Sequence, residues 1–210
     1  MWGVIMRIIT ISRQYGSGGR EIGQNLAKIL GYDYYDWEII TAIASKSGLE
    51  EQFIEQILDN IKLQSFPMNY HCSYGTNASL QSNQINLLLE QKKVVENIAI
   101  FGRDCVIVGR NADVLLKKYR PFNIFICGSM ESRIKRCMER AGKDNIYTAK
   151  EIEKKIKNID KNRAHVRELL SGSDWGNPTA YHITVNTTNW KVNNIAPSLA
   201  DCATKWFENR

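Results

Sequence analysis

Residues 8–30 read IITISRQYGSGGREIGQNLAKIL, and this stretch decides the predicted fold. The run at residues 8–11 is apolar and β-branched, which is typical of a buried strand. A glycine-rich turn follows at residues 16–19. The next segment repeats apolar residues at helical spacing, namely Ile22, Leu26, Ile29 and Leu30. A strand, a glycine turn and a helix in this order predict a phosphate site, because the backbone N–H groups and the helix N-terminus attract an anion.

The glycine turn matches the phosphate-loop pattern G-x-x-x-x-G-K-[ST] only in part. Gly18 occupies the second glycine position, whereas Arg13 stands at the first. Gly19 and Arg20 stand where the pattern has its lysine and its magnesium-binding hydroxyl. Arg20 is the candidate to replace the missing charge, because guanidinium binds phosphate through paired hydrogen bonds. A glycine turn without a ligand is the alternative interpretation.

The composition is that of an ordinary globular protein with an excess of basic residues. A chain of 210 residues is long enough for one well-buried core, and its 43% hydrophobic and 24% charged residues are usual proportions. The net charge is +6, and the basic residues are spread along the chain. This distribution suits a site for small polyanions, and no nucleic-acid-binding motif is recognisable. A nucleic-acid partner is therefore not expected.

Five scattered cysteines, none in a C-x-x-C pair, predict reduced thiols rather than disulfides or a metal site. The sequence contains no apolar run long enough to cross a membrane and no recognisable signal peptide. Together these observations favour a cytoplasmic protein that contacts no membrane.

Beyond the first helix, predicted strands alternate with predicted helices. The strands are expected at residues 32–36, 105–108, 123–127 and 182–186. Helices are expected at residues 37–45, 49–63, 79–100, 111–119 and 148–170, with a further helix after Ser129 and a last one near Pro197. This alternation predicts one α/β domain over residues 1–210, with a doubly wound parallel sheet and helices on both faces.

Several charged residues are expected to meet at one edge of this sheet. Asp36 ends the second strand and Arg110 follows the third, so both lie at the strand ends where ligands collect in parallel sheets. Arg163 and Arg167 lie one turn apart on the long helix, where the apolar stripe would otherwise continue. An arginine in such a stripe is costly unless it is paired or faces a cleft. Each one alone is equally consistent with a salt bridge, and Asp160 is a possible partner for Arg163.

The ordered set ITISRQYGSGGREIG, YYD, VIVGRNAD, DKNRAHVRELL, DWGNP and ITVNT resembles the cytidylate kinase-like family, a branch of the nucleoside monophosphate kinases. The resemblance extends over residues 6–186. It implies a P-loop kinase fold with an acceptor-binding helical lobe at about 37–100 and a lid region at about 140–175. It also implies transfer of the ATP γ-phosphoryl group, with Mg²⁺, to a nucleoside monophosphate such as CMP. Segments 64–77 and 141–147 are expected to be mobile.

The resemblance assigns roles to individual residues. The donor phosphates would contact the loop, namely Arg13, Gly16, Ser17, Gly18, Gly19 and Arg20. Arg110 matches the Gly-Arg that holds the acceptor phosphate, and Asp36 is expected to be an acceptor contact or an outer-shell magnesium ligand. Arg20, Arg163 and Arg167 would be catalytic. The chain departs from cytidylate kinases at Asn111, where they carry Asp, and Gly102-Arg103-Asp104 precedes its strand and is not equivalent.

Two other functions remain open at this stage. A kinase that phosphorylates a hydroxyl group on a small molecule would need a carboxylate base, for which Asp36 is the candidate. A nucleotide- or phosphate-binding protein without turnover would fit the loss of the loop lysine. The base and sugar of the acceptor and the oligomeric state are not determined by the sequence.

Overall fold

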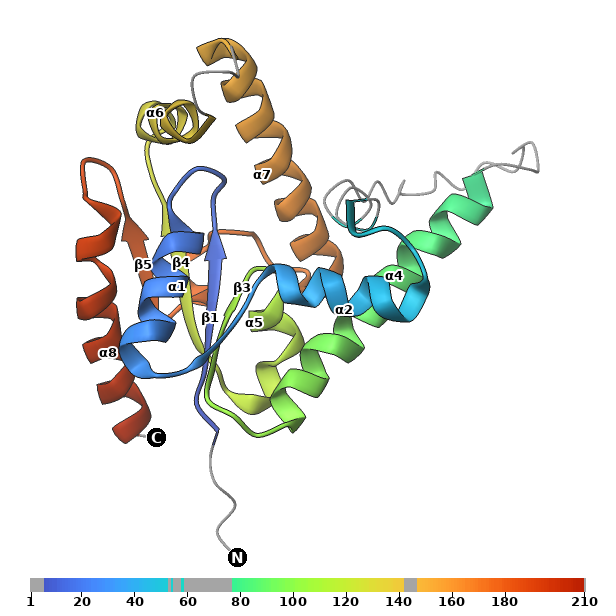
Figure 1. The fold of residues 1–210 in the computed structure, drawn as a ribbon, viewed down its shortest axis with the longest axis horizontal. Coiled ribbons are helices and arrows are strands. Elements are labelled where there is room, and N and C mark those ends of the chain that lie inside the picture. Colours follow the sequence, from blue (N-terminus) through green and yellow to red (C-terminus); the bar gives the residue numbers. More distant parts are fainter. Residues whose placement is uncertain (1–5, 53, 55–57, 59–76, 142–146, 210) are drawn as a thin grey trace, which may run out of the picture.

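The computed structural model describes residues 6–52, 54, 58, 77–141 and 147–209. Within these residues, five strands form one all-parallel sheet in the spatial order β2-β3-β1-β4-β5 (Figure 1). The strands are β1 (Ile8–Arg13), β2 (Asp33–Tyr35), β3 (Cys105–Val108), β4 (Phe122–Cys127) and β5 (Ile183–Asn186).

The strand order reverses beside β1, because the chain first adds β2 and β3 on one side and then β4 and β5 on the other. Ile9 of β1 pairs with Val106 of β3 and with Phe122 of β4. This arrangement confirms the predicted doubly wound α/β fold. In such sheets a ligand crevice forms at the carboxyl ends of the strands next to the reversal, which here is the end of β1.

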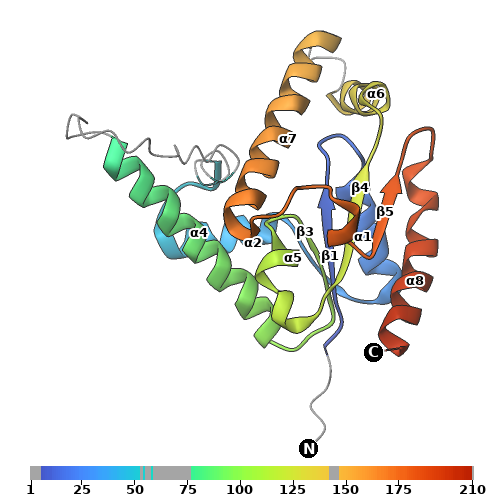
Figure 2. The same cartoon turned by 180° about the vertical axis from the view of Figure 1, so that it is seen from behind.

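Helices cover both faces of the sheet (Figures 1 and 2). Helices α1 (Gly19–Leu30) and α8 (Ala196–Glu208) pack on one face. Helices α2 (Trp37–Ser47), α4 (Asn77–Ile100) and α5 (Ala112–Leu115) pack on the other. Helix α6 (Met130–Ala141) and much of α7 (Ala149–Ser171) lie beyond the carboxyl ends of the strands.

Strand β1 is rich in isoleucine because it is buried from both sides, although Thr10, Ser12 and Arg13 are polar. Ile9 and Ile11 belong to the core under α1 and α8, whereas Ile8 belongs to the core under α2, α4 and α5. All three side chains are fully buried. Burial of such a side chain contributes roughly 1.5–3 kcal/mol, so β1 anchors both cores.

The helix-end signals in the sequence are confirmed. Gly31 ends α1 in a left-handed conformation (φ 69°), and Thr148 and Glu151 form a capping box at the start of α7. Pro197 lies in the first turn of α8.

Other predicted elements differ or lie outside the described residues. The helix predicted at 111–119 begins one residue later, because Asn111 is left-handed (φ 51°), and it is divided at Leu116 into α5 and the 3₁₀ helix η1 (Lys117–Tyr119). Most of the helix predicted at 49–63, and nearly all of the segments 64–77 and 141–147, lie outside the described residues, so the mobility prediction stays a prediction.

None of the helices in the described residues combines the length and the apolar character that a membrane span requires. The same part of the chain contains no cluster of three or more His, Cys, Asp or Glu side chains that could hold a metal ion.

His182 makes the stability of the β4–β5 edge depend on pH. The Asn123 N–H group donates to His182 Nδ1 (2.8 Å), and the imidazole lies 4.9 Å from the Trp206 ring, where partial burial lowers its pKa below 6.5. The unfolded chain therefore binds the proton more readily, and stability present above pH 6.5 is lost as the pH falls. Because the imidazole is partly exposed, we expect the melting temperature to drop only about 1–2 °C more in wild type than in His182→Gln between pH 7.5 and 5. Equal drops in thermal unfolding would contradict this.

Candidate active site

A cavity of about 830 Å³ lies at the carboxyl ends of β1 and β3. Its walls come from the glycine loop, the turn after β3, helices α4, α6 and α7, and the loop after α7. The predicted site residues that line it are Arg13, Gly16, Gly18, Gly19, Arg20, Arg110 and Arg163. Ser17, Asp36 and Arg167 do not line it.

The glycine loop has a shape that only glycine accommodates at two positions. Gly16 and Gly18 are left-handed, with φ of 76° and 85°. A Cβ atom at Gly16 would lie 2.9 Å from Cys137 Sγ of α6, and one at Gly18 would lie 2.8 Å from Val192 Cγ2. Ser17 closes the loop from within, because its Oγ donates to the Gln14 carbonyl (2.8 Å). The loop ends at α1, whose first N–H groups have no intrahelical partner, as at the start of any α-helix.

Helices α6 and α7 both form hydrogen bonds with the backbone of Tyr15 in the loop. The Tyr15 N–H group donates to Asp160 Oδ1 (2.8 Å), and the Tyr15 carbonyl accepts from Arg133 Nε (2.7 Å). Arg133 and Asp160 also form an ion pair with each other. Arg136 Nη1 donates to the Gly16 carbonyl (3.1 Å). We call Arg133, Asp160 and the backbone N–H and C=O groups of Tyr15 the loop clamp.

The loop clamp corrects one expectation from the sequence. Asp160 is ion-paired with Arg133 of α6, whereas the sequence left Arg163 as its possible partner. Arg133 is the buried residue of α6 (4% exposed), while Met138 of the same helix is 46% exposed. The physical reason is that the loop presents backbone carbonyl groups to α6, and these need donors rather than apolar contacts.

The turn after β3 is strained where it faces the cavity. Gly109, Arg110 and Asn111 are all left-handed, with φ of 77°, 56° and 51°. Such conformations cost non-glycine residues roughly 1–3 kcal/mol each and are found mainly at functional sites. The Gln91 side chain of α4 donates to the Arg110 carbonyl (3.2 Å) and supports the turn. Gly102-Arg103-Asp104 lies before β3, at the other end of that strand.

Asp36 lies behind the cavity as a shared counter-ion. It is 2% exposed and is ion-paired with Arg20, while Arg13 Nη2 lies 3.5 Å from its Oδ1. The Arg20 side chain is about half exposed, so its ion pair with Asp36 is open to solvent on one side.

Arg13 and Arg163 bring further positive charge to the cavity. Burial, followed by repulsion from Arg163, lowers the pKa of Arg13 to about 9, so its guanidinium is still charged at neutral pH. Arg163 Nη1 donates to the Arg13 carbonyl (3.0 Å), and its guanidinium lies 5.9 Å from the Tyr15 ring centre. Arg13, Arg20, Arg110 and Arg163 therefore surround one cavity.

Arg167 points elsewhere, although it lies one turn after Arg163. The residue is 4% exposed, and its guanidinium forms an ion pair with Asp113 of α5. Its Nε donates to Ser173 Oγ (3.2 Å), and it lies 5.3 Å from the Tyr181 ring centre.

Sequence reasoning missed several residues that line or support the cavity, namely Arg133, Arg136, Lys155 and Trp175. The recurrence of arginine at positions 133, 136 and 140 at helical spacing was the available signal for α6. Trp175 follows α7 and carried no periodic signal.

These features define a protein with the fold of the P-loop kinases. The chain belongs to the cytidylate kinase-like family, whose model matches residues 8–189. No curated protein matches the chain.

Three solved structures illustrate the fold. An uncharacterized protein from Eubacterium ventriosum has a TM-score of 0.67 and 24% identity, covering 98% of this chain and 99% of that one. Shikimate kinase from Acinetobacter baumannii, in complex with shikimate, has a TM-score of 0.55 and 14% identity, covering 95% and 94%. A gluconokinase from Sinorhizobium meliloti has a TM-score of 0.54 and 14% identity, covering 98% and 95%.

Proposed function

We propose that this protein is an ATP-dependent kinase that transfers the γ-phosphoryl group to a nucleoside monophosphate such as CMP. The observation that carries the proposal is the convergence of Arg13, Arg20, Arg110 and Arg163 on one cavity beside the glycine loop, with Asp36 as the buried carboxylate partner of the first two. Membership of the cytidylate kinase-like family supports the same class of reaction.

The charge of the cavity suits the transfer of a phosphoryl group. A kinase must place two phosphate groups in line and stabilise the negative charge that develops between them. Guanidinium groups fixed in a partly enclosed site do this without reorganising during the reaction. An acceptor that is itself a phosphate oxygen needs no dedicated base, so arginines can provide most of the catalysis.

The residues around the cavity fit the phosphates of ATP but provide few ligands for Mg²⁺. The loop at 16–19 and Arg20 would contact the donor phosphates, Arg110 the acceptor phosphate, and Arg163 the transferring group. The position of the magnesium-binding hydroxyl is taken by Arg20, and Asp36 is already ion-paired. Mg²⁺ would therefore be held mainly by the nucleotide phosphates, whose charge it neutralises, with Asp36 in its outer shell.

One wall of the cavity is aromatic and could bind the base of the acceptor. Trp175 lines the cavity, and Phe125 contacts its ring edge-on, with the centroids 5.4 Å apart at 88°. A ring fixed in this way can stack on a planar base. Gln91 of α4 also lines the cavity, which supports the proposal that the region at about 37–100 binds the acceptor. Helices α6 and α7, within about 140–175 and just before it, would form the lid.

A kinase for a small-molecule hydroxyl group is the second candidate, with Asp36 as its base. Asp36 is engaged by both Arg20 and Arg13, an arrangement that suits a counter-ion better than a base that must accept a proton. The nucleotide acceptor is therefore the better-supported choice.

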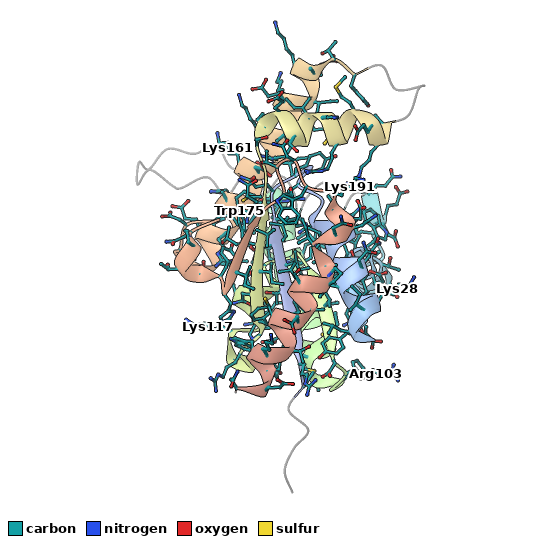
Figure 3. All side chains as sticks on the ribbon, turned by 90° about the vertical axis from the view of Figure 1, so that its left-hand side faces the viewer. Lys28, Arg103, Lys117, Lys161, Trp175 and Lys191 are labelled. Atoms are coloured by element: carbon teal, nitrogen blue, oxygen red, sulfur yellow. The ribbon has the colours of Figure 1, made fainter. Side chains whose placement is uncertain are left out.

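We expect ADP release from ATP and Mg²⁺ to depend on an added nucleoside monophosphate when a panel of these and of small alcohols is screened. Arg110→Gln should raise the KM of the acceptor by about tenfold or more, because a charged hydrogen bond to phosphate is worth about 1.5–3 kcal/mol. Arg103→Gln is the matched control, because it follows a glycine in the same way but lies at the opposite end of β3 from the cavity. Figure 3 shows Arg103 far from Trp175.

The screen also separates the alternatives. Turnover with alcohols alone would identify a hydroxyl kinase. A rise in melting temperature with ATP, without turnover on any acceptor, would identify a non-catalytic binder and contradict the proposal.

A further inference from the structure

The side chain of Arg13 occupies space that two glycines leave open. A Cβ atom on Gly19 would lie 2.7 Å from Arg13 Cβ and 3.0 Å from its Cγ. A Cβ atom on Gly109 would overlap the Arg13 guanidinium. Arg13 therefore crosses the backbone at the start of α1 and ends against the turn after β3.

This packing links the two departures from the phosphate-loop pattern. Position 19 is where the pattern has its lysine, and position 13 is where it has its first glycine. With Arg13 in place, no side chain fits at position 19, because the atoms in conflict belong to the stem near the backbone. The absence of the lysine at position 19 and the presence of Arg13 are thus sterically linked.

Arg13 also has the charge environment of an anion ligand. Its side chain is 13% exposed, it lines the cavity, and its nearest carboxylate oxygen in the described residues is 3.5 Å away on Asp36. Because Asp36 is shared with Arg20, it compensates the buried Arg13 guanidinium only in part, and a bound anion would stabilise Arg13 further. Arg20, by contrast, is half exposed, and its Nε forms an ion pair with Asp36.

We infer that Arg13 supplies the positive charge that the loop lysine supplies in the standard motif, and that it contacts the phosphates where the donor and acceptor sites meet. The geometry places its guanidinium between the glycine loop and the Gly109-Arg110 turn. The catalytic part of this inference rests on the proposed kinase function. The anion contact does not, so the two can be tested separately.

The exchange can be reversed by mutation. Arg13→Gly combined with Gly19→Lys restores the pattern G-x-x-x-x-G-K in residues 13–19. Binding of inorganic tripolyphosphate is measured by calorimetry, together with the melting temperature. We expect Arg13→Gly to weaken binding about 10- to 100-fold, because a charged hydrogen bond is lost. Gly19→Lys alone should lower the melting temperature, and the double variant should recover both properties in large part.

Arg13→Met keeps the stem of the side chain and removes only the charge. It should lose tripolyphosphate affinity at nearly unchanged melting temperature, which a purely structural role would not produce. The inference is overturned if Arg13→Met binds tripolyphosphate as well as wild type, or if Gly19→Lys is as stable as wild type with Arg13 present. Failure of the wild-type protein to bind tripolyphosphate would overturn the proposed function as well.

Discussion

Arg167→Met is expected to lower the free energy of unfolding by about 3–5 kcal/mol, because it leaves the carboxylate of Asp113 buried without its cation. Both partners of this ion pair are almost fully buried, at 4% and 5% exposed. In a chain of this size the loss corresponds to a fall in melting temperature of roughly 6–20 °C. Urea unfolding at pH 7.5 measures it directly.

The double variant Asp113→Leu with Arg167→Met is the control. A buried ion pair replaced by apolar side chains of similar size is often as stable as the original. The double variant should therefore recover much of the stability that Arg167→Met loses. If Arg167→Met instead keeps its stability and loses turnover, Arg167 has the catalytic role that the family resemblance implied.

Arg163→Ala is expected to reduce turnover by about 10²–10³-fold, with a much smaller effect on ATP binding. Removing a group that stabilises charge present only in the transition state lowers turnover and leaves ground-state affinity nearly unchanged. Arg163 lines the cavity and donates to the Arg13 carbonyl, so its removal also costs about 1 kcal/mol of stability. Steady-state kinetics with the acceptor found in the screen, together with ATP titration, separates these effects.

Two further variants serve as controls for the Arg163→Ala result. Lys161→Ala, on the exposed side of the same helix, should leave turnover and stability near wild type. Asp160→Asn should weaken the loop clamp and lower both melting temperature and ATP affinity, because Tyr15 and Arg133 both bind that carboxylate. Arg163→Ala with wild-type turnover per folded molecule would exclude a catalytic role.

The fold was predictable because its signals are local. The apolar run of β1, the glycine turn and the amphipathic α1 are contiguous, and each follows from periodicity and turn chemistry. The carboxyl ends of parallel strands must share one edge, which is why Arg20, Asp36 and Arg110 were expected near one another before any contact was known.

The partners of charged side chains were not predictable, because they lie far apart in the sequence. Arg163 and Arg167 share one face of α7, yet Arg163 lines the cavity whereas Arg167 is buried in the core. Their different surroundings depend on Asp113, a residue on α5 that no spacing rule connects to α7. The clash between Arg13 and Gly19 likewise depends on side-chain direction, which periodicity does not give.

The loop clamp couples two positions on separate helices. A substitution of Arg133 by a neutral residue leaves the Asp160 carboxylate without its cation and the Tyr15 carbonyl without its donor. We therefore expect substitutions at positions 133 and 160 to have non-additive effects on stability. Position 15 is under no such constraint from the clamp, because Tyr15 contributes only backbone atoms to it.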